Sequence, residues 1–331
     1  QIEDYSMSKV TQSQSTLTKL FGAALLSTFV SAASAQAISI ATSNPGSIYH
    51  GSGQVLAKML TEKMNLKTTI QPFASPSVFI PAINAGEIPL GMANIADLTW
   101  AVEGKEHFKG RPYTDIRAIS VAYPLRSTIF VRKDSDIKTL ADLKGRRVVD
   151  GFTSQKVILP ILDAMYATVG LTTSDMKGVQ IPNVGAGADA FSAGKTDMFF
   201  FALGSPKPRE VDAAVGGIRI LSMPNTPEAL TAIKKHYSPG YIRAEKPSPG
   251  NVGVLEPGYS LAYDALVFGS AKTPDDVAYA VAKLMYENAK ELGKDFPPFR
   301  LFATESMIKD FGPLTYHPGA LKFYREVGLV K

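Results

Sequence analysis

The amino-acid sequence predicts an α/β fold, on three observations. Short apolar segments of strand length alternate along the chain with segments whose apolar residues recur at helical spacing. Clusters that contain Gly and Pro separate the two kinds of segment. The 331 residues suffice for about two domains of ordinary size. Alternation of this kind is typical of parallel sheets whose strands are joined by crossover helices.

The first half of the chain shows the alternation in order. An apolar strand and a Gly/Pro loop precede Val55, Leu56, Met59 and Leu60, which recur at helical spacing. Glycine often ends a helix, so Gly86 is the expected stop of the next one. The strands predicted here are 38–41, 67–70, 90–93, 117–122, 128–132 and 147–150, and the helices include 77–85 and a short one that ends at Gly145.

The second half repeats the pattern and ends in helices. Pro274 follows Thr273 as a proline does at the first position of a helix, and Pro318 opens the last helix in the same way. We interpret His317 as a capping or packing residue, and the aromatic run 199–201 as a buried strand. The strands predicted here are 179–181, 198–201, 218–221 and 262–268, and the helices are 155–169, 274–293 and one from 318 onward.

Composition and charge exclude several classes of protein. A hydrophobic fraction of 45% and a charged fraction of 20% indicate a chain that buries a core. The lack of cysteine excludes disulfides, cysteine-ligated metals and a cysteine nucleophile. The 35 basic and 30 acidic residues are interspersed and give a net charge of +5, without the concentrated basic face of a nucleic-acid binder. We therefore expect no nucleic-acid partner.

The N-terminal segment has the pattern of a secretory signal peptide. Lys9 and Lys19 precede an apolar run at 20–30, and small residues follow at 31–37. A basic region, a short apolar region and an A-x-A site define such peptides. The apolar run is too short to cross a membrane, which needs about 20 apolar residues. A buried first helix is the alternative interpretation.

Two cleavage positions fit the signal peptide, after Ala35 and after Ala37. We interpret residues 1–6 as an upstream extension, and residues 1–37 as the segment removed with the peptide. Export through such a peptide predicts a periplasmic protein.

The sequence contains no recognisable reaction centre. Its four histidines are scattered, and none has a metal-ligand spacing such as HExxH. Neither a G-x-S-x-G nucleophile elbow nor a phosphate-binding P-loop occurs. The stretch 185–190 spells G-x-G-x-x-A, but no strand ending in an acidic residue follows about 20 positions later. We interpret it as a loop that opens a small-residue helix, and predict no catalytic residue, no metal and no cofactor.

Five segments carry a resemblance to a known family. The tail 317–328 (HPGALKFYREVG) is the most specific, and the others are NAGEIPLG at 84–91, DLKGRRV at 142–148, GKTDMFF at 194–200 and PGSIY at 45–49. Their counterparts are the HPGA…YY.E.G ending, the NAGE-D-G, DLKGKRV and G-x-x-D-A-F-F segments and the GG-x-Y-Y element of the TAXI family. The chain therefore resembles the TAXI family of TRAP-transporter substrate-binding proteins along its whole length after the signal peptide.

The resemblance implies a two-lobed periplasmic binding protein fold of type II. Each lobe would be a mixed, mostly parallel sheet flanked by helices, with hinge strands between the lobes. Lobe I would comprise 38–123 and 262–331, and lobe II 124–261. Members of the family capture small organic acids or amino acids such as glutamate and dock transiently with an ion-driven permease. We accordingly expect a monomeric, non-enzymatic binding protein for a carboxylate or amino acid, with a TRAP-type permease as partner.

The chain departs from the family pattern in two places. The family's glycine-rich first loop is here the stiffer and bulkier segment 43–45. Phe79 stands where many members carry an asparagine. An apolar ring cannot donate a hydrogen bond to a ligand, so this departure favours a more apolar or aromatic acid over glutamate.

Loops at the carboxyl ends of strands are the expected place of the ligand. An anion in a closed cleft is best held by helix N-terminal N–H groups and a few directed donors. The loops selected in this way are 42–49, 71–79, 93–97, 123–127, 150–155 and 201–206.

Eight residues in these loops are candidate ligand contacts. Thr153 and Ser154 precede the long helix and could form a carboxylate nest. Arg126 could clamp a carboxylate with its guanidinium fork. Each candidate also has a structural interpretation as a cap, a packing residue or a solvated charge. The candidates are Ser47, Tyr49, Asn94, Tyr123, Arg126, Thr153, Ser154 and Ser205.

Two alternative functions stay open. A binding protein of an ATP-driven or tripartite tricarboxylate importer would share the fold and differ in its permease. An exported enzyme on the same fold would need a nucleophile or an acid–base pair in the cleft.

Overall fold

The computed structural model describes residues 37–331, and the predicted signal peptide lies outside this range apart from Ala37. The strands are β1 (Ile38–Thr42), β2 (Thr68–Pro72), β3 (Leu90–Asn94), β4 (Ile116–Arg132), β5 (Arg147–Gly151), β6 (Lys177–Ile181), β7 (Phe199–Ala202), β8 (Ile218–Leu221), β9 (Tyr241–Glu245) and β10 (Gly258–Ser270). The α-helices are α1 (Ile48–Met64), α2 (Pro76–Ala85), α3 (Ile95–Glu103), α4 (Ile158–Ala167), α5 (Val184–Ser192), α6 (Pro206–Val215), α7 (Pro227–His236), α8 (Asp275–Glu287), α9 (Ala289–Asp295) and α10 (Pro318–Glu326). Short 3-10 helices are η1 (Glu106–Phe108), η2 (Leu140–Leu143), η3 (Thr173–Asp175), η4 (Pro297–Leu301) and η5 (Thr304–Ser306).

The strands form a large mixed sheet and a small parallel one. The large sheet has the order β2-β1-β3-β10-β4-β7, with β8 also paired to β4 and β9 to β10. Strands β1, β2 and β3 run parallel, whereas β10 runs antiparallel to β3 and β4. Strands β5 and β6 form the parallel pair. The alternation of strands and helices confirms the predicted α/β class.

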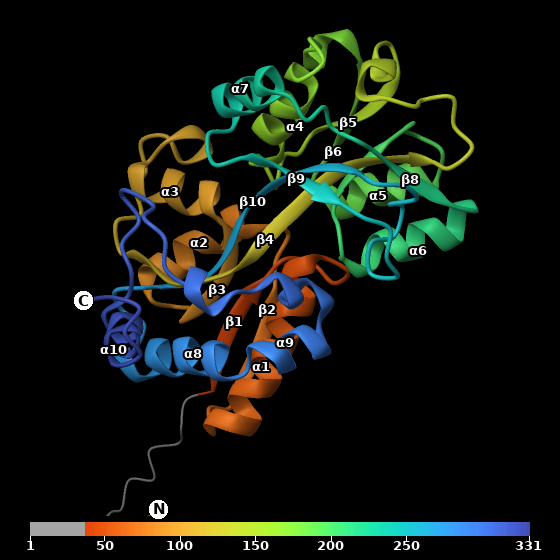
Figure 1. Ribbon diagram of the computed structural model, residues 1–331. Coiled ribbons are helices and arrows are strands. Elements are labelled where there is room, and N and C mark those ends of the chain that lie inside the picture. Colours follow the sequence, from red (N-terminus) through yellow and green to blue (C-terminus); the bar gives the residue numbers. More distant parts are fainter. Residues whose placement is uncertain (1–36) are drawn as a thin grey trace, which may run out of the picture. The chain divides into compact units, whose positions relative to one another are not determined.

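Two long strands connect the two ends of the large sheet. Strands β4 and β10 pair antiparallel from Leu261 opposite Ser127 to Ser270 opposite Ile116. One end of β10 pairs with β9 and the other with β3, and Figure 1 shows β4 and β10 running together between these two groups of elements. The lobe boundaries expected at 123 and 262 fall within this pair. We therefore propose β4 and β10 as the hinge strands.

Strand β4 replaces the two strands predicted at 117–122 and 128–132. Pro124, which suggests a break, lies within the strand opposite Asp264 of β10. Strand β7 pairs with β4 only from Ser127 to Phe130. The lack of an N–H at Pro124 therefore removes no hydrogen bond between β4 and β7. The proline is therefore tolerated.

Several helices differ from the prediction. Helices α3, α6 and α7 are not predicted, and two of them begin with Pro206 and Pro227 at the first helical position, where proline is tolerated. The helix predicted at 274–293 begins one residue later, at Asp275, and is interrupted after Glu287, and α4 is shorter than the predicted 155–169. The stop at Gly86 is confirmed, because this residue ends α2 in the left-handed conformation with φ 82°.

Phe79 lies in the core and not at a ligand position. Its side chain is fully buried, with its ring centroid 5.5 Å from that of Phe73 and 6.3 Å from that of Phe268. The aromatic ring at this position therefore says nothing about the ligand, and the preference for a more apolar or aromatic acid loses the observation on which it was based.

A second buried cluster gathers around β7. The rings of Phe130 and Phe199 stack with centroids 4.9 Å apart, and Phe191 lies 4.9 Å from Phe199. This arrangement confirms that the aromatic run is a buried strand.

His317 holds the start of α10. Its Nδ1 accepts a hydrogen bond from the backbone N–H of Gly319 at 3.1 Å, so the proton is on Nε2, which lies 2.9 Å from the carbonyl oxygen of Thr273. Burial is the main cause that lowers the pKa of His317 below its ordinary 6.5. The expected capping role is confirmed.

Acidification is expected to destabilise the protein in part through His317. Its pKa is lower in the folded than in the unfolded chain, so the unfolded chain binds more protons and stability falls as the pH drops through 6.5. Urea unfolding at pH 7.5 and pH 5 should show a larger loss for the wild type than for His317→Asn, whose amide side chain does not titrate. Equal losses in the two proteins would contradict the role given to this imidazole.

Candidate functional site

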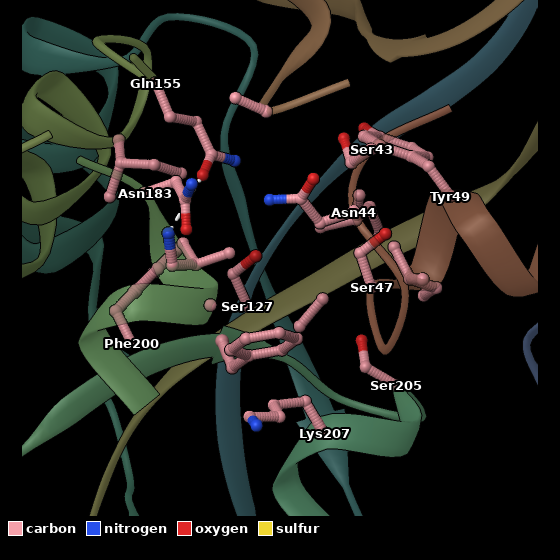
Figure 2. Close-up of a pocket in the computed structure, with 18 of the residues that line it drawn as sticks. Ser43, Asn44, Ser47, Tyr49, Ser127, Gln155, Asn183, Phe200, Ser205 and Lys207 are labelled. Atoms are coloured by element: carbon pink, nitrogen blue, oxygen red, sulfur yellow. Dashed lines mark hydrogen bonds between the residues drawn. The ribbon is translucent and has the colours of Figure 1, made fainter. Parts of the chain in front are cut away.

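A cavity of about 340 Å³ lies where the loops at the strand ends meet. Figure 2 shows polar side chains facing it from several directions, with Gln155 and Asn183 on one side and Ser43, Asn44 and Tyr49 on the other. Each of the six loops selected from the sequence contributes to the lining. The lining includes Ser43, Asn44, Ser47, Tyr49, Asn94, Leu125, Ser127, Gln155, Ile158, Asn183, Gly185, Asp189, Phe200, Ser205, Lys207 and Tyr263.

Four helices begin at the cavity. Their N-cap residues are Ser47 for α1, Asn94 for α3, Asn183 for α5 and Ser205 for α6, and all four line it. The first N–H groups of a helix have no partner within the helix and give that end a partial positive charge. The cavity is therefore electrostatically suited to an anion.

The hydroxyl of Ser205 is free because of the sequence that follows it. An N-cap side chain normally accepts a hydrogen bond from the second or third residue of the helix. Here the third residue is Pro208, which has no N–H, and the N–H of Lys207 donates to the carbonyl oxygen of Gly46 at 3.2 Å. The Ser205 hydroxyl therefore stays available to the cavity.

Three buried hydroxyls on the lining have no hydrogen-bond partner among residues 37–331. They belong to Ser43, Tyr49 and Ser205, and each residue is only 6% exposed. Burial, followed by the neighbouring Tyr263, Tyr123 and Asp97, raises the pKa of Tyr49 well above its ordinary value, so the phenol keeps its proton. Buried polar groups are usually paired, so these three hydroxyls point to a polar ligand.

The charges at the cavity form their own network. Lys207 Nζ lies 2.8 Å from Asp189 Oδ1 and 3.3 Å from Glu210 Oε2. The hydrogen bond with Asp189 is the main cause that raises the pKa of Lys207. Apolar contact surface comes from Leu125, Ile158 and Phe200 among others, so the cavity can hold a carbon skeleton between polar groups.

The structure brings four of the eight predicted residues to the cavity. These are Ser47, Tyr49, Asn94 and Ser205. Tyr123 is fully buried behind the lining, and its hydroxyl lies 2.6 Å from that of Ser52. It therefore packs in the hinge region and does not reach the cavity.

Arg126 is occupied by an ion pair. Its Nη1 donates to Glu245 Oε2 at 2.7 Å and to Asn251 Oδ1 at 3.1 Å, and Ser260 donates to the other carboxylate oxygen of Glu245 at 2.7 Å. The two charged side chains are 10% and 2% exposed. The structure thus gives the guanidinium a protein carboxylate as partner, and Arg126 is not part of the lining.

Thr153 and Ser154 line a different, smaller hollow of about 230 Å³ together with His107 and Arg111. The carbonyl oxygen of Ser154 accepts hydrogen bonds from the hydroxyls of Ser75 and Ser77. These contacts join the loop before α4 to the start of α2.

Several lining residues are absent from the sequence-based candidates, notably Gln155, Asn183 and Lys207. Asn183 lies two residues before the glycine pattern at 185–190, which forms the first turns of α5 and not a dinucleotide loop. The sequence signal that could have identified Asn183 as a lining residue is an asparagine in the N-cap position before a helix of small residues.

Residues 37–331 lack two further features. No group of three or more histidine, aspartate or glutamate side chains in this range is arranged to hold a metal ion. None of the helices in this range combines the length and the apolar character needed to span a membrane.

Solved structures share the fold at low sequence identity. One described as a periplasmic transporter has 12% identity and a TM-score of 0.54, with coverage of 88% of this chain and 92% of that one. A protein from Bordetella bronchiseptica RB50 has 15% identity and a TM-score of 0.52, with coverage of 89% and 99%. The alkanesulfonate-binding protein SsuA from Xanthomonas axonopodis pv. citri has 18% identity, a TM-score of 0.45 and coverage of 81% and 82%. The two-lobed periplasmic binding protein fold is thereby confirmed.

The family is shown by the sequence profile that matches the chain. The profile of the NMT1-like family covers residues 40–328, which is nearly all of the described chain. The more specific resemblance to TAXI proteins stays a prediction. The chain belongs to the NMT1-like family.

Proposed function

We propose that the protein is a solute-binding protein that captures a small organic anion in the cavity at the strand ends. One observation carries the proposal: four helix N-termini converge on a cavity in which three buried hydroxyls lack a hydrogen-bond partner within residues 37–331. An anion in the cavity would accept hydrogen bonds from these hydroxyls and would interact favourably with the helix N-termini.

Binding, and not catalysis, is the proposed role of these residues. The polar lining consists of hydroxyls, amides and the pair between Lys207 and Asp189. Such groups orient and hold a ligand through hydrogen bonds. Ser127 and Tyr263 are already hydrogen-bonded to each other at 2.8 Å.

Hinge closure is the proposed mechanism. Two contacts join residues of the proposed lobe I to residues of the proposed lobe II, from the Lys207 N–H to the Gly46 carbonyl and from the Ser77 hydroxyl to the Ser154 carbonyl at 3.3 Å. We propose that β4 and β10 bend to open these contacts and that the ligand, held from both sides, favours the closed form. A membrane permease would recognise that form.

The proposed partner and location rest on two features of the sequence. The HPGA-containing tail at 317–328 supports a TRAP-type permease, and the pattern of residues 9–37 supports export to the periplasm. Uptake by vesicles that contain such a permease should then need an ion gradient and no ATP. A requirement for ATP would instead assign the protein to an ATP-driven importer.

A thermal-shift screen of the purified protein tests the proposed function. Ligands that bind the folded state raise the melting midpoint, by RT ln(1 + [L]/Kd) at constant temperature. Carboxylates, sulfonates, amino acids and neutral sugars would be compared at equal concentration. We expect a concentration-dependent rise with at least one small organic anion and no product. A response to sugars alone, or turnover of the ligand, would overturn the proposal.

A further inference from the structure

Two serines beside the cavity bind a backbone carbonyl of the other proposed lobe. Ser75 Oγ donates to the carbonyl oxygen of Ser154, and Ser77 Oγ lies 2.8 Å from Ser75 Oγ and 3.3 Å from the same carbonyl oxygen. Ser75 and Ser77 belong to the proposed lobe I, whereas Ser154 belongs to the proposed lobe II. Ser75 is fully buried. We call these three residues the serine clasp.

The hydroxyl of Ser75 is available because it does not cap its own helix. Ser75 is the N-cap residue of α2, but its side chain accepts no hydrogen bond from that helix. Pro76 occupies the first helical position and has no N–H, and the N–H of Val78 donates to the backbone carbonyl of Ser75 at 3.1 Å. An N-cap serine normally stabilises the helix that it precedes. Here its side chain binds the other proposed lobe instead.

Each half of the clasp is fixed within its own lobe. On the side of α2, the buried ring of Phe79 packs 6.3 Å from that of Phe268 between centroids. On the other side, the N–H of Ser154 donates to the carbonyl oxygen of Pro182 at 3.0 Å. Neither half can follow the other if the lobes separate. The clasp therefore forms only when the two lobes are close together.

The loop that carries the Ser154 carbonyl has an uncommon backbone conformation. Gly151 and Phe152 have φ values of 81° and 39°. A positive φ is ordinary for glycine but rare for a bulky residue, and residues held in such conformations concentrate at functional sites. Phe152 is fully buried, so the surrounding core holds it in place. This conformation supports a functional role for the loop.

The clasp lies next to the cavity without being part of its lining. Ala74 and Gln155 line the cavity, and each is the neighbour in sequence of a clasp residue. Gln155 Oε1 accepts from the backbone N–H of Val184 at 3.0 Å, so its NH₂ group stays available to a ligand. Opening the clasp would move Ala74 and Gln155 apart and so separate the two walls of the cavity.

We infer that the serine clasp stabilises the closed form and thereby slows the release of the bound anion. Hydrogen bonds that exist only in the closed form favour that form, and a ligand held between the lobes leaves after they open. The clasp residues are thus positioning residues, since none of them lines the cavity. This inference rests on the proposed function and adds residues that control closure.

Release kinetics test the effect on the site. The probe is whichever of succinate, glutarate, glutamate and ethanesulfonate gives the largest thermal shift. In Ser75→Ala/Ser77→Ala its dissociation rate should rise about five-fold or more, because the closed form loses hydrogen bonds, and its association rate should stay nearly unchanged. Ser192→Ala, which removes a hydrogen bond to the Ala188 carbonyl within α5, should change neither rate. An unchanged dissociation rate in the clasp variant, with or without a loss of stability, would overturn the inference.

A distance measurement tests the clasp without a ligand. The chain has no cysteine, so Lys109→Cys and Lys195→Cys, at exposed positions on the two proposed lobes, can each carry one spin label. We expect a short-distance population with the clasp intact and a larger share of long distances after Ser75→Ala/Ser77→Ala. Identical distance distributions would overturn the inference. If none of the anions binds, the proposed function fails, and the distances still decide whether the clasp stabilises the closed form.

Discussion

Replacing Arg126 with alanine is expected to lower the free energy of unfolding by about 3–5 kcal/mol, because the change leaves a buried charge without its partner. Glu245 would keep the hydrogen bond from Ser260 but lose the guanidinium, at a site where its side chain is only 2% exposed. The loss should appear as a lower denaturant midpoint with an unchanged slope.

Arg243→Ala provides the matched control for this variant. Arg243 lies on β9, two residues before Glu245, and is partly exposed. Its removal should cost less than about 1 kcal/mol. Arg126→Ala that stays folded in the assay should also retain its affinity for the anion. If Arg126→Ala instead weakens ligand binding and leaves the stability unchanged, Arg126 binds the carboxylate of the ligand, as the sequence analysis suggested.

Removing two cavity hydroxyls together, in Tyr49→Phe/Ser205→Ala, is expected to weaken anion binding by about 100-fold or more. Hydrogen bonds to charged groups contribute about 1.5–3 kcal/mol each, so two of them amount to at least about 3 kcal/mol. Stability without ligand should change by less than about 1 kcal/mol, because neither hydroxyl has a protein partner to lose among residues 37–331.

The opposite balance of effects would contradict this account of the cavity. A double variant that binds the anion normally, or one that unfolds easily, would assign the hydroxyls to structure. Tyr286→Phe/Ser238→Ala makes the same chemical changes outside the cavity and should alter neither affinity nor stability.

The place of the site could be predicted because it depends on local rules. Strands β1 and β3 run parallel, so residues at or just after their carboxyl ends, such as Asn94 and Ser47, meet at one edge of the sheet. Helix N-caps can be recognised from a few neighbouring residues. The loops of the cavity could therefore be predicted, and four of the eight candidate residues lie on its lining.

The partners of individual side chains could not be predicted in the same way. Arg126 and Glu245 are 119 residues apart, and they meet only because β4 and β9 both flank β10. The free hydroxyl of Ser205 depends on Lys207 donating to Gly46, a contact with a loop far away in the chain. Such features arise from tertiary packing, which no local pattern encodes.

A crystal structure of the protein with the strongest anion from the screen tests the central claim most directly. The claim is that neutral donors at helix N-termini hold the ligand. We predict anion oxygens within hydrogen-bond distance of Tyr49 and Ser205 on one wall and of the Gln155 NH₂ group on the other, with the pair between Arg126 and Glu245 intact. An anion bound to the Arg126 guanidinium, or seated outside this cavity, would contradict it.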